Sequence, residues 1–171
     1  MIAPTDWYAR EFRFELPLEA WAGIVERLRG TPARLADRLL PLPEDLLTQC
    51  PGEEWSIQEH AGHLFDLCEI EIGRLDDILS GAPFLRIADL ENRKTYAANY
   101  NSRALKDILA SFHRERSRFV ERLERLDIHD IQLSALHPRL KQPLRVIDHA
   151  WFFAEHDDHH LAQITFLINT L

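Results

Sequence analysis

The apolar residues of this chain recur at three- and four-residue spacing along nearly its whole length, and this periodicity limits the fold more than any other feature. Such spacing puts side chains on one face of an α-helix. Glycine is scarce, and no stretch alternates β-branched and polar residues as a half-buried strand would. The hydrophobic content of 46% in 171 residues is enough to enclose one core. We therefore predict an all-α fold in a single domain that spans residues 1–171.

Four long helices are expected from the start and stop signals. Residues 18–40 form a first helical region, which should break near Gly30 because Thr31 and Pro32 have the pattern of a fresh N-cap and first-turn proline. Residues 102–126 form the third helix. We interpret the charged run RERSRFVERLER on this helix as a solvated surface with local opposite-charge pairs.

The second helix has the clearest start signal. Ser56 and Glu59 form a capping box, in which each side chain bonds a free backbone donor of the other residue, and the helix should end near Gly81. A long connection over residues 82–101 follows, and such connections allow helices of a bundle to run parallel. Pro143 suits the first turn of a last helix that continues almost to the end of the sequence.

Charge and hydropathy exclude several functions. The chain has 20 Lys plus Arg against 28 Asp plus Glu, a net charge of −8, and no basic block, so binding to a nucleic-acid backbone is not supported. No apolar run is long enough to span a bilayer, and the start of the chain lacks a basic segment followed by an apolar one. We expect a cytoplasmic protein without membrane contact. Cys50 and Cys68 form no CxxC motif, which fits reduced thiols rather than a zinc knot.

Nine histidines are a high number for this length, and they are clustered. His156 and His160 lie four residues apart on the last helix, so both imidazoles project from one face and can reach one ion. On a helical wheel both lie on or beside the apolar face. His159 lies outside that face, and His149 lies two turns earlier, roughly 10 Å along the axis, which is too far to join the pair.

A third metal ligand has to come from the second helix. His60 and His63 both flank its apolar stripe, and the periodicity does not choose between them. The alternative is that these are ordinary buried histidines bonded to carboxylates. The zinc-protease signature HExxH is absent, since Asp157 and Asp158 follow His156. The HxxxH pair combined with a histidine on another helix nevertheless favours a metal site.

The segments EEWSIQEHAGHLFD and AEHDDHHLAQI together resemble the DinB-like superfamily. The resemblance implies a four-helix bundle with a long connection between helices two and three, commonly a homodimer. It also implies a divalent metal ion bound by one histidine of helix two and the HxxxH pair of the last helix. By position these ligands are His63, His156 and His160, so the resemblance selects His63 and leaves His60 in reserve. We expect zinc or nickel, with iron as a further option. The segment before Trp21 is not covered by the resemblance.

An ion held by three imidazoles keeps open positions, where it lowers the pKa of a bound water or thiol. The resemblance therefore implies a metal-dependent enzyme acting on a small molecule, either a hydrolase or a thiol S-transferase that uses a low-molecular-weight thiol. Two other classes stay open. One is a metal-containing small-molecule-binding protein without turnover, and the other is a structural helical dimer with incidental histidines. Trp21 and Trp151 are compatible with a dimer interface.

Two acidic residues near the histidines have two interpretations. Glu71 and Asp157 either orient the metal ligands or have a purely structural role. We favour the structural role, with Glu71 and Arg74 as a buried ion pair at i, i+3 spacing and Asp157 bonded to His160 or to a neighbouring helix. Trp55, just before the second helix, is expected to pack against the end of the bundle.

Overall fold

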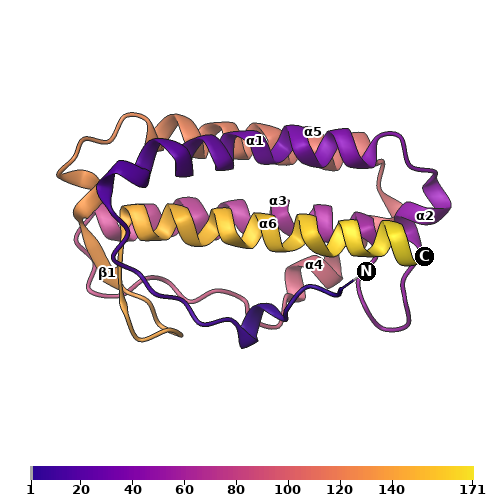
Figure 1. Ribbon diagram of the computed structural model, residues 1–171, viewed down its shortest axis with the longest axis horizontal. Helices are drawn as coiled ribbons and strands as arrows, with labels where there is room; N and C mark the ends of the chain where they lie inside the picture. Colours follow the sequence, from indigo (N-terminus) through magenta and orange to yellow (C-terminus); the bar gives the residue numbers. More distant parts are fainter. Residues whose placement is uncertain (1) are drawn as a thin grey trace.

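The computed structural model describes residues 2–171 and contains a bundle of four long helices. These are α1 (Trp21–Leu39), α3 (Ile57–Leu79), α5 (Leu105–Leu123) and α6 (Val146–Thr170). They form two layers, with α1 beside α5 and α3 beside α6 (Figure 1). The predicted four-helix bundle with a long connection between its second and third helices is confirmed. Within residues 2–171, no helix has the length and apolar character needed to cross a membrane.

Short elements lie before the first long helix and in the segments between the long helices. They are η1 (Trp7–Ala9), η2 (Leu18–Ala20), α2 (Glu44–Thr48), α4 (Arg93–Ala98), η3 (Tyr100–Ser102), η4 (Asp130–Gln132), β1 (Ser134–Leu136) and β2 (Pro143–Arg145). The two strands form an antiparallel hairpin in which Ala135 pairs with Leu144. The elements α4 and η3 lie inside the long connection, so that connection is partly helical.

Each long helix passes through two apolar clusters, and the order in which it meets them gives its direction. The first cluster includes Leu28, Leu75, Phe119 and Phe153, and the second includes Leu35, Leu64, Phe112 and Ile164. Helices α1 and α6 run from the first cluster to the second, whereas α3 and α5 run from the second to the first. Although α3 and α5 are consecutive in the bundle, they are therefore parallel, and the long connection returns the chain to the starting end.

The predicted break in the first helix is wrong. Helix α1 continues through Pro32. A proline inside a helix removes one backbone hydrogen bond, but the residues on either side of it hold the turn. The hydroxyl of Thr31 donates to the carbonyl oxygen of Arg27 at 3.1 Å, and Leu28 and Leu35 are fully buried on the inner face. Tertiary packing therefore outweighs the local stop signal.

The last helix also begins later than predicted. Pro143 belongs to β2, and α6 starts at Val146. Its start is capped by Asp148, which accepts hydrogen bonds from the backbone N–H of Arg145 at 3.2 Å and from the Nε of Arg145 at 2.7 Å. This cap replaces the proline as the start signal. The third long helix, α5, is shorter at both ends than the predicted 102–126.

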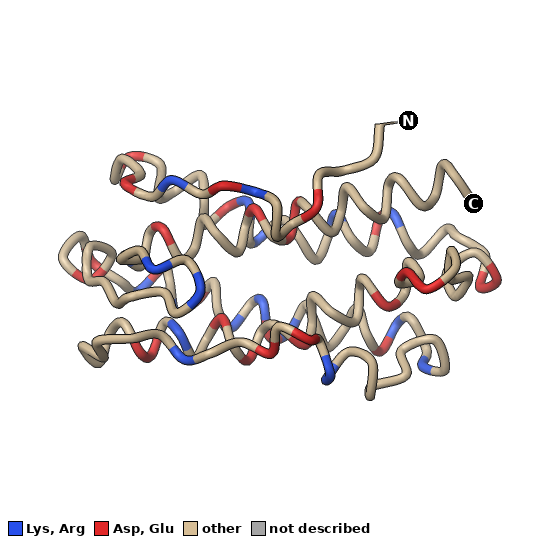
Figure 2. Tube along the Cα trace, turned by 90° about the horizontal axis from the view of Figure 1, so that it is seen from below, with Lys and Arg blue, Asp and Glu red and all other residues tan. Residues whose placement is uncertain are grey.

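Charged residues of both signs are interspersed along the helices (Figure 2). Several pairs follow the i, i+3 spacing expected from the sequence, such as Arg118 with Glu115 at 3.2 Å and Arg29 with Glu26 at 3.0 Å. These pairs are exposed to solvent, so each contributes little to stability.

Candidate metal centre

Three histidines from two helices converge between the two apolar clusters. His63 lies on α3, and His156 and His160 lie one turn apart on α6. One ring nitrogen from each lies within 4.8 Å of the other two, and all three side chains are buried. The structure thus brings together the three residues that the family resemblance implies as metal ligands.

These imidazoles are neutral because they are buried close to one another. Burial lowers the pKa of His63 to about 3. Burial and the neighbouring histidines hold the pKa of His156 and the pKa of His160 well below the ordinary value. A neutral imidazole has a free lone pair, which is the form that binds a metal ion.

The contacts of His63 determine which of its nitrogens carries the proton. Its Nδ1 lies 3.1 Å from the Oγ1 of Thr95, and that hydroxyl donates to Asp66 at 2.9 Å. Because the single hydroxyl proton goes to Asp66, Thr95 accepts from the Nδ1–H of His63. The Nε2 of His63 is therefore the atom with the free lone pair. Asp66 also accepts from the hydroxyl of Tyr100 at 2.7 Å.

The spacing of the α6 pair fits a shared ion. The Nε2 atoms of His156 and His160 lie 3.2 Å apart. Two nitrogens bound to one tetrahedral zinc ion lie about 3.4 Å apart, given bond lengths of about 2.1 Å. The Nδ1 of His156 is buried without a hydrogen-bond partner among the described residues. Trp7 holds this ring instead, by edge-on packing with ring centroids 4.7 Å apart.

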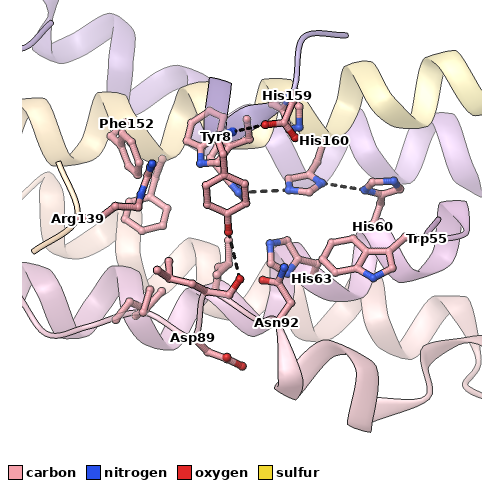
Figure 3. Close-up of a pocket in the computed structure, with 18 of the residues that line it drawn as sticks. Tyr8, Trp55, His60, His63, Asp89, Asn92, Arg139, Phe152, His159 and His160 are labelled. Carbon is pink, nitrogen blue, oxygen red and sulfur yellow. Dashed lines mark hydrogen bonds between the residues drawn. The ribbon is translucent and has the colours of Figure 1, made fainter. Parts of the chain in front are cut away.

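The other histidines have different surroundings. The Nδ1 of His60 lies 2.8 Å from the Nδ1 of His160, so His60 contacts one of the three candidate ligands and is not itself one of them (Figure 3). His159 lines the cavity and packs against Trp7. His149 is separate, as expected, and its Nε2 contacts the carbonyl oxygen of Glu71 at 3.0 Å.

A cavity of about 500 Å³ opens beside the histidines. Its lining includes Trp55, which packs against His63 with ring centroids 4.7 Å apart and so belongs to the wall of the site. The long connection contributes the exposed side chains of Ile87, Leu90 and Tyr96. A cavity of this size can hold a drug-sized molecule.

The N-terminal segment (residues 2–20) forms another wall, which the sequence prediction missed. Trp7 is buried against α6, and Tyr8 lines the mouth of the cavity. Arg10 fixes the segment by an ion pair with Glu155 at 2.6 Å. The available signal was the density of aromatic residues before the first helix, since Trp7, Phe12 and Phe14 are all buried.

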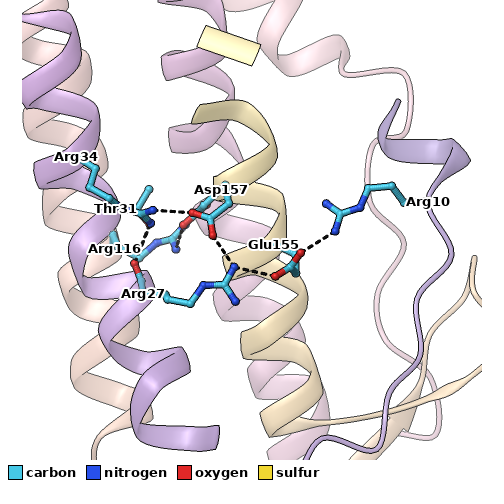
Figure 4. A network of polar contacts seen from close by, with 8 residues as sticks. Arg10, Arg27, Thr31, Arg34, Arg116, Glu155 and Asp157 are labelled. Atoms are coloured by element: carbon cyan, nitrogen blue, oxygen red, sulfur yellow. Dashed lines mark hydrogen bonds and ion pairs between the residues drawn. The ribbon is translucent and has the colours of Figure 1, made fainter. Parts of the chain in front are cut away.

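The predicted ion pair between Glu71 and Arg74 is wrong. Glu71 instead accepts from Arg116 of α5 at 2.7 Å, and Asp157 accepts from the same guanidinium at 2.6 Å. Asp157 thus bonds to a neighbouring helix, one of the two expected alternatives, and Figure 4 shows its position beside Arg116. Arg74 donates to the carbonyl oxygen of Arg86. Burial raises the pKa of Glu71, although Arg116 opposes this shift.

Arg116 also corrects the prediction of a fully solvated charged run. Its side chain is 1% exposed, between the two apolar clusters. The signal is its register, because Arg116 follows Phe112 by four residues and precedes Phe119 by three, which puts it on the inner face of the helix. Since Asp157 directly follows His156, the contact with Arg116 fixes α6 next to the histidine cluster.

The bundle and its buried histidine cluster define a helical protein with a candidate metal centre. The sequence matches the DinB superfamily over residues 27–164, and the chain belongs to that family. The match begins after the N-terminal segment. No curated protein matches the sequence.

A solved structure has the same fold. It is YfiT from Bacillus subtilis, described as a probable metal-dependent hydrolase with an unusual four-helix bundle topology. The two structures superpose with a TM-score of 0.83 over 94% of this chain and 92% of that chain, at 19% sequence identity. At this level of identity the similarity establishes the fold.

Proposed function

We propose that this protein is a metal-dependent hydrolase that acts on a small molecule. One divalent ion, zinc or nickel with iron as a further option, is bound by His63, His156 and His160. The observation that supports this proposal is the convergence of three buried, neutral imidazoles at the wall of an open cavity of about 500 Å³. The description of YfiT as a probable metal-dependent hydrolase supports the same reaction class.

Such an ion acts as a Lewis acid and lowers the pKa of a bound water or thiol. The residues of this chain orient the ligands. Thr95 accepts from the Nδ1–H of His63 and leaves Nε2 free. Burial lowers the pKa of His60 to about 4, so its imidazole is neutral and has one acceptor nitrogen. With the Nδ1 of His60 as that acceptor, the Nδ1–H of His160 donates to it and the Nε2 of His160 is left free. Trp7 packs against His156 and excludes water from that side.

Thiol S-transfer from a low-molecular-weight thiol is the second candidate. It is favoured by the size of the cavity, which has room for a thiol and an acceptor side by side.

The homodimer stays a prediction, to be tested by light scattering. Trp21 and Trp151, considered for its interface, are half-buried against the first apolar cluster.

The test is elemental analysis of untagged protein purified without added metal. We expect close to one ion per chain in the wild type and a loss of the ion in His63→Ala, His156→Ala and His160→Ala, each checked for folding by circular dichroism. His113→Ala, which removes an exposed histidine of α5, is the matched control and should keep the ion. Loaded protein is then screened for ester and amide hydrolysis and for thiol conjugation. Folded wild-type protein that cannot be loaded with zinc or nickel would contradict the proposal.

A further inference from the structure

The end of the cavity away from Trp55 and His60 contains two arginines. Arg74 of α3 and Arg139 of the loop between β1 and β2 both line the cavity. Figure 3 shows Arg139 beside Phe152, on the far side of Tyr8 from His63 and His160. The cavity therefore has a histidine end and an arginine end.

The charge of Arg74 is buried without an anionic partner. The side chain is 4% exposed; it donates to the carbonyl oxygen of Arg86 at 3.1 Å and lies 3.1 Å from the Nε2 of His137. The nearby carboxylate of Asp77 is bound by Arg86 through two side-chain hydrogen bonds. Within residues 2–171, no carboxylate forms an ion pair with Arg74 or Arg139. Buried charges in proteins are normally paired, as Arg116 is here, so this end of the cavity lacks a negative charge.

His137 adds to the excess of donors. Its Nδ1 faces the backbone N–H groups of Arg139 and Leu140 at 3.2 and 3.1 Å, and its Nε2 faces an N–H of Arg74. A neutral imidazole has one N–H and one acceptor nitrogen, so it cannot accept from both sides. Burial and the two arginines lower the pKa of His137 to about 3, which keeps it neutral. The hydrogen-bond donors here outnumber the acceptors that the protein provides.

We propose that the arginine end of the cavity, formed by Arg74 and Arg139, binds a carboxylate of the substrate. This inference rests on the proposed function for the other end, where the reacting group lies at His63, His156 and His160. A guanidinium presents a planar pair of N–H donors that matches the two oxygens of a carboxylate. The acidic residues that line the cavity do not cancel this preference, because all of them are exposed. They are Asp6, Glu53, Glu54 and Asp89.

The helix geometry gives the approximate length of such a substrate. Arg74 follows His63 by 11 positions on α3, which corresponds to about 16 Å along the helix axis. Both side chains lean toward the N-terminus of α3, so they leave this axial separation largely unchanged. A metal–ligand bond of about 2 Å at one end and a hydrogen bond of about 3 Å at the other take up part of it, which leaves roughly 10 Å for the substrate itself. The wall between the two ends is apolar, with Ile70 of α3 and Phe152 of α6. The substrate is therefore a slender molecule with a carboxylate about 10 Å from its reacting group.

The test compares 6-mercaptohexanoate with its neutral analogue 6-mercaptohexanamide, using calorimetric titration of the zinc-loaded protein. The thiol is the metal-binding group of both probes, and only the first has a carboxylate. We expect the carboxylate to bind about tenfold to a hundredfold more tightly, as charge-assisted hydrogen bonds do. Arg139→Gln should reduce this ratio to near one. Arg125→Gln removes an exposed arginine of the same charge and should preserve it.

Arg74→Lys is the second variant, because it keeps the charge of a buried residue and so protects the fold while removing the paired donors. It should reduce the ratio at least several-fold. Equal affinity of the wild type for both probes would overturn the proposal. The proposal would also be overturned if Arg139→Gln and Arg74→Lys both kept the wild-type ratio of the two affinities.

A second titration separates this proposal from the metal function. Chelator-treated protein is titrated with hexanoate and with hexanamide, neither of which has a thiol. A preference for hexanoate that disappears in Arg139→Gln supports the carboxylate site even if the protein proves unable to hold a metal ion. Zinc-dependent binding of both thiols without any preference for the carboxylate would contradict this site and leave the proposed function standing.

Discussion

The Nδ1 atom of His63 lies 3.1 Å from the hydroxyl oxygen of Thr95, which belongs to the short helix α4 of the long connection. Thr95 is 3% exposed, and its hydroxyl donates a hydrogen bond to Asp66 of α3. The connection that allows α3 and α5 to run parallel therefore also orients a predicted metal ligand.

Thr95→Val should weaken zinc binding about tenfold to a hundredfold while the protein stays folded, because the orienting partner of His63 is lost without a change in side-chain shape. The measurement is competition with a chromophoric zinc chelator. Thr48→Val, on the remote helix α2, is the matched control and should bind zinc as the wild type does. Equal affinities in the two variants would show that Thr95 does not orient His63.

The buried contacts of Arg116 give a prediction about stability. Arg116→Met should lower the free energy of unfolding by about 3–5 kcal/mol, because it leaves the buried Glu71 and Asp157 without their partner. The measurement is urea denaturation of chelator-treated protein. Arg114→Met breaks an exposed ion pair with Glu115 and should cost less than about 1 kcal/mol.

Replacing the whole buried group should cost less than breaking it. The triple variant Glu71→Leu, Arg116→Met and Asp157→Leu removes all three charges together, so no unpaired charge stays buried. We expect it to recover most of the stability lost in Arg116→Met. A triple variant as unstable as the single one would mean that the ion pairs themselves stabilise the bundle.

His149 should make the protein less stable in acid. Burial lowers the pKa of His149 in the folded state to about 3, whereas an unfolded histidine titrates near 6.5. Between these values the unfolded chain binds the extra proton, so the free energy of unfolding falls as the pH falls below about 6.5. The contribution reaches about 1.4 kcal/mol per pH unit.

His149→Gln should therefore show a shallower loss of stability between pH 6.5 and 4 than the wild type, measured by urea denaturation at several pH values. The raised pKa of Glu71 has the opposite effect on the pH dependence of stability. Because Glu71 is present in both the wild type and the variant, its contribution cancels when their slopes are compared. His113→Gln is the exposed control and should keep the wild-type slope. Parallel slopes for all three proteins would mean that His149 is not buried in its neutral form.

The sequence predicts what depends on periodicity and on neighbours along one helix. The capping box of Ser56 and Glu59 begins α3 as predicted, because its two partners are three residues apart. His156 and His160 share a face for the same reason. The choice of His63 over His60 rests on the family resemblance, because both residues flank the same apolar stripe of α3. Which of the two meets His156 and His160 depends on where α6 packs, and the periodicity of α3 does not give that position.

The features that the sequence did not predict depend on contacts between distant segments. Arg116 belongs to a highly charged run, and its partners Glu71 and Asp157 lie 45 and 41 positions away along the chain. Thr95 lies in a connection without clear periodicity, and its role depends on where that connection folds back onto α3. The wall formed by Trp7 depends on the path of the N-terminal segment along α6, which no local signal specifies.

Gly62 gives a last prediction, because it marks a close approach between α3 and the long connection. A Cβ atom at this position would come within 2.2–2.5 Å of the ring of Tyr100, which is 1% exposed. Gly62→Ala should therefore displace Tyr100, lower the free energy of unfolding by about 1–3 kcal/mol and weaken zinc binding through Asp66 and Thr95. Urea denaturation and the zinc competition assay measure the two effects. Gly23→Ala on α1 is the control: nothing lies within 4 Å of its added Cβ, and the change should stabilise the protein by about 0.4–1 kcal/mol. Equal stability of the two alanine variants would show that Tyr100 does not pack closely on α3.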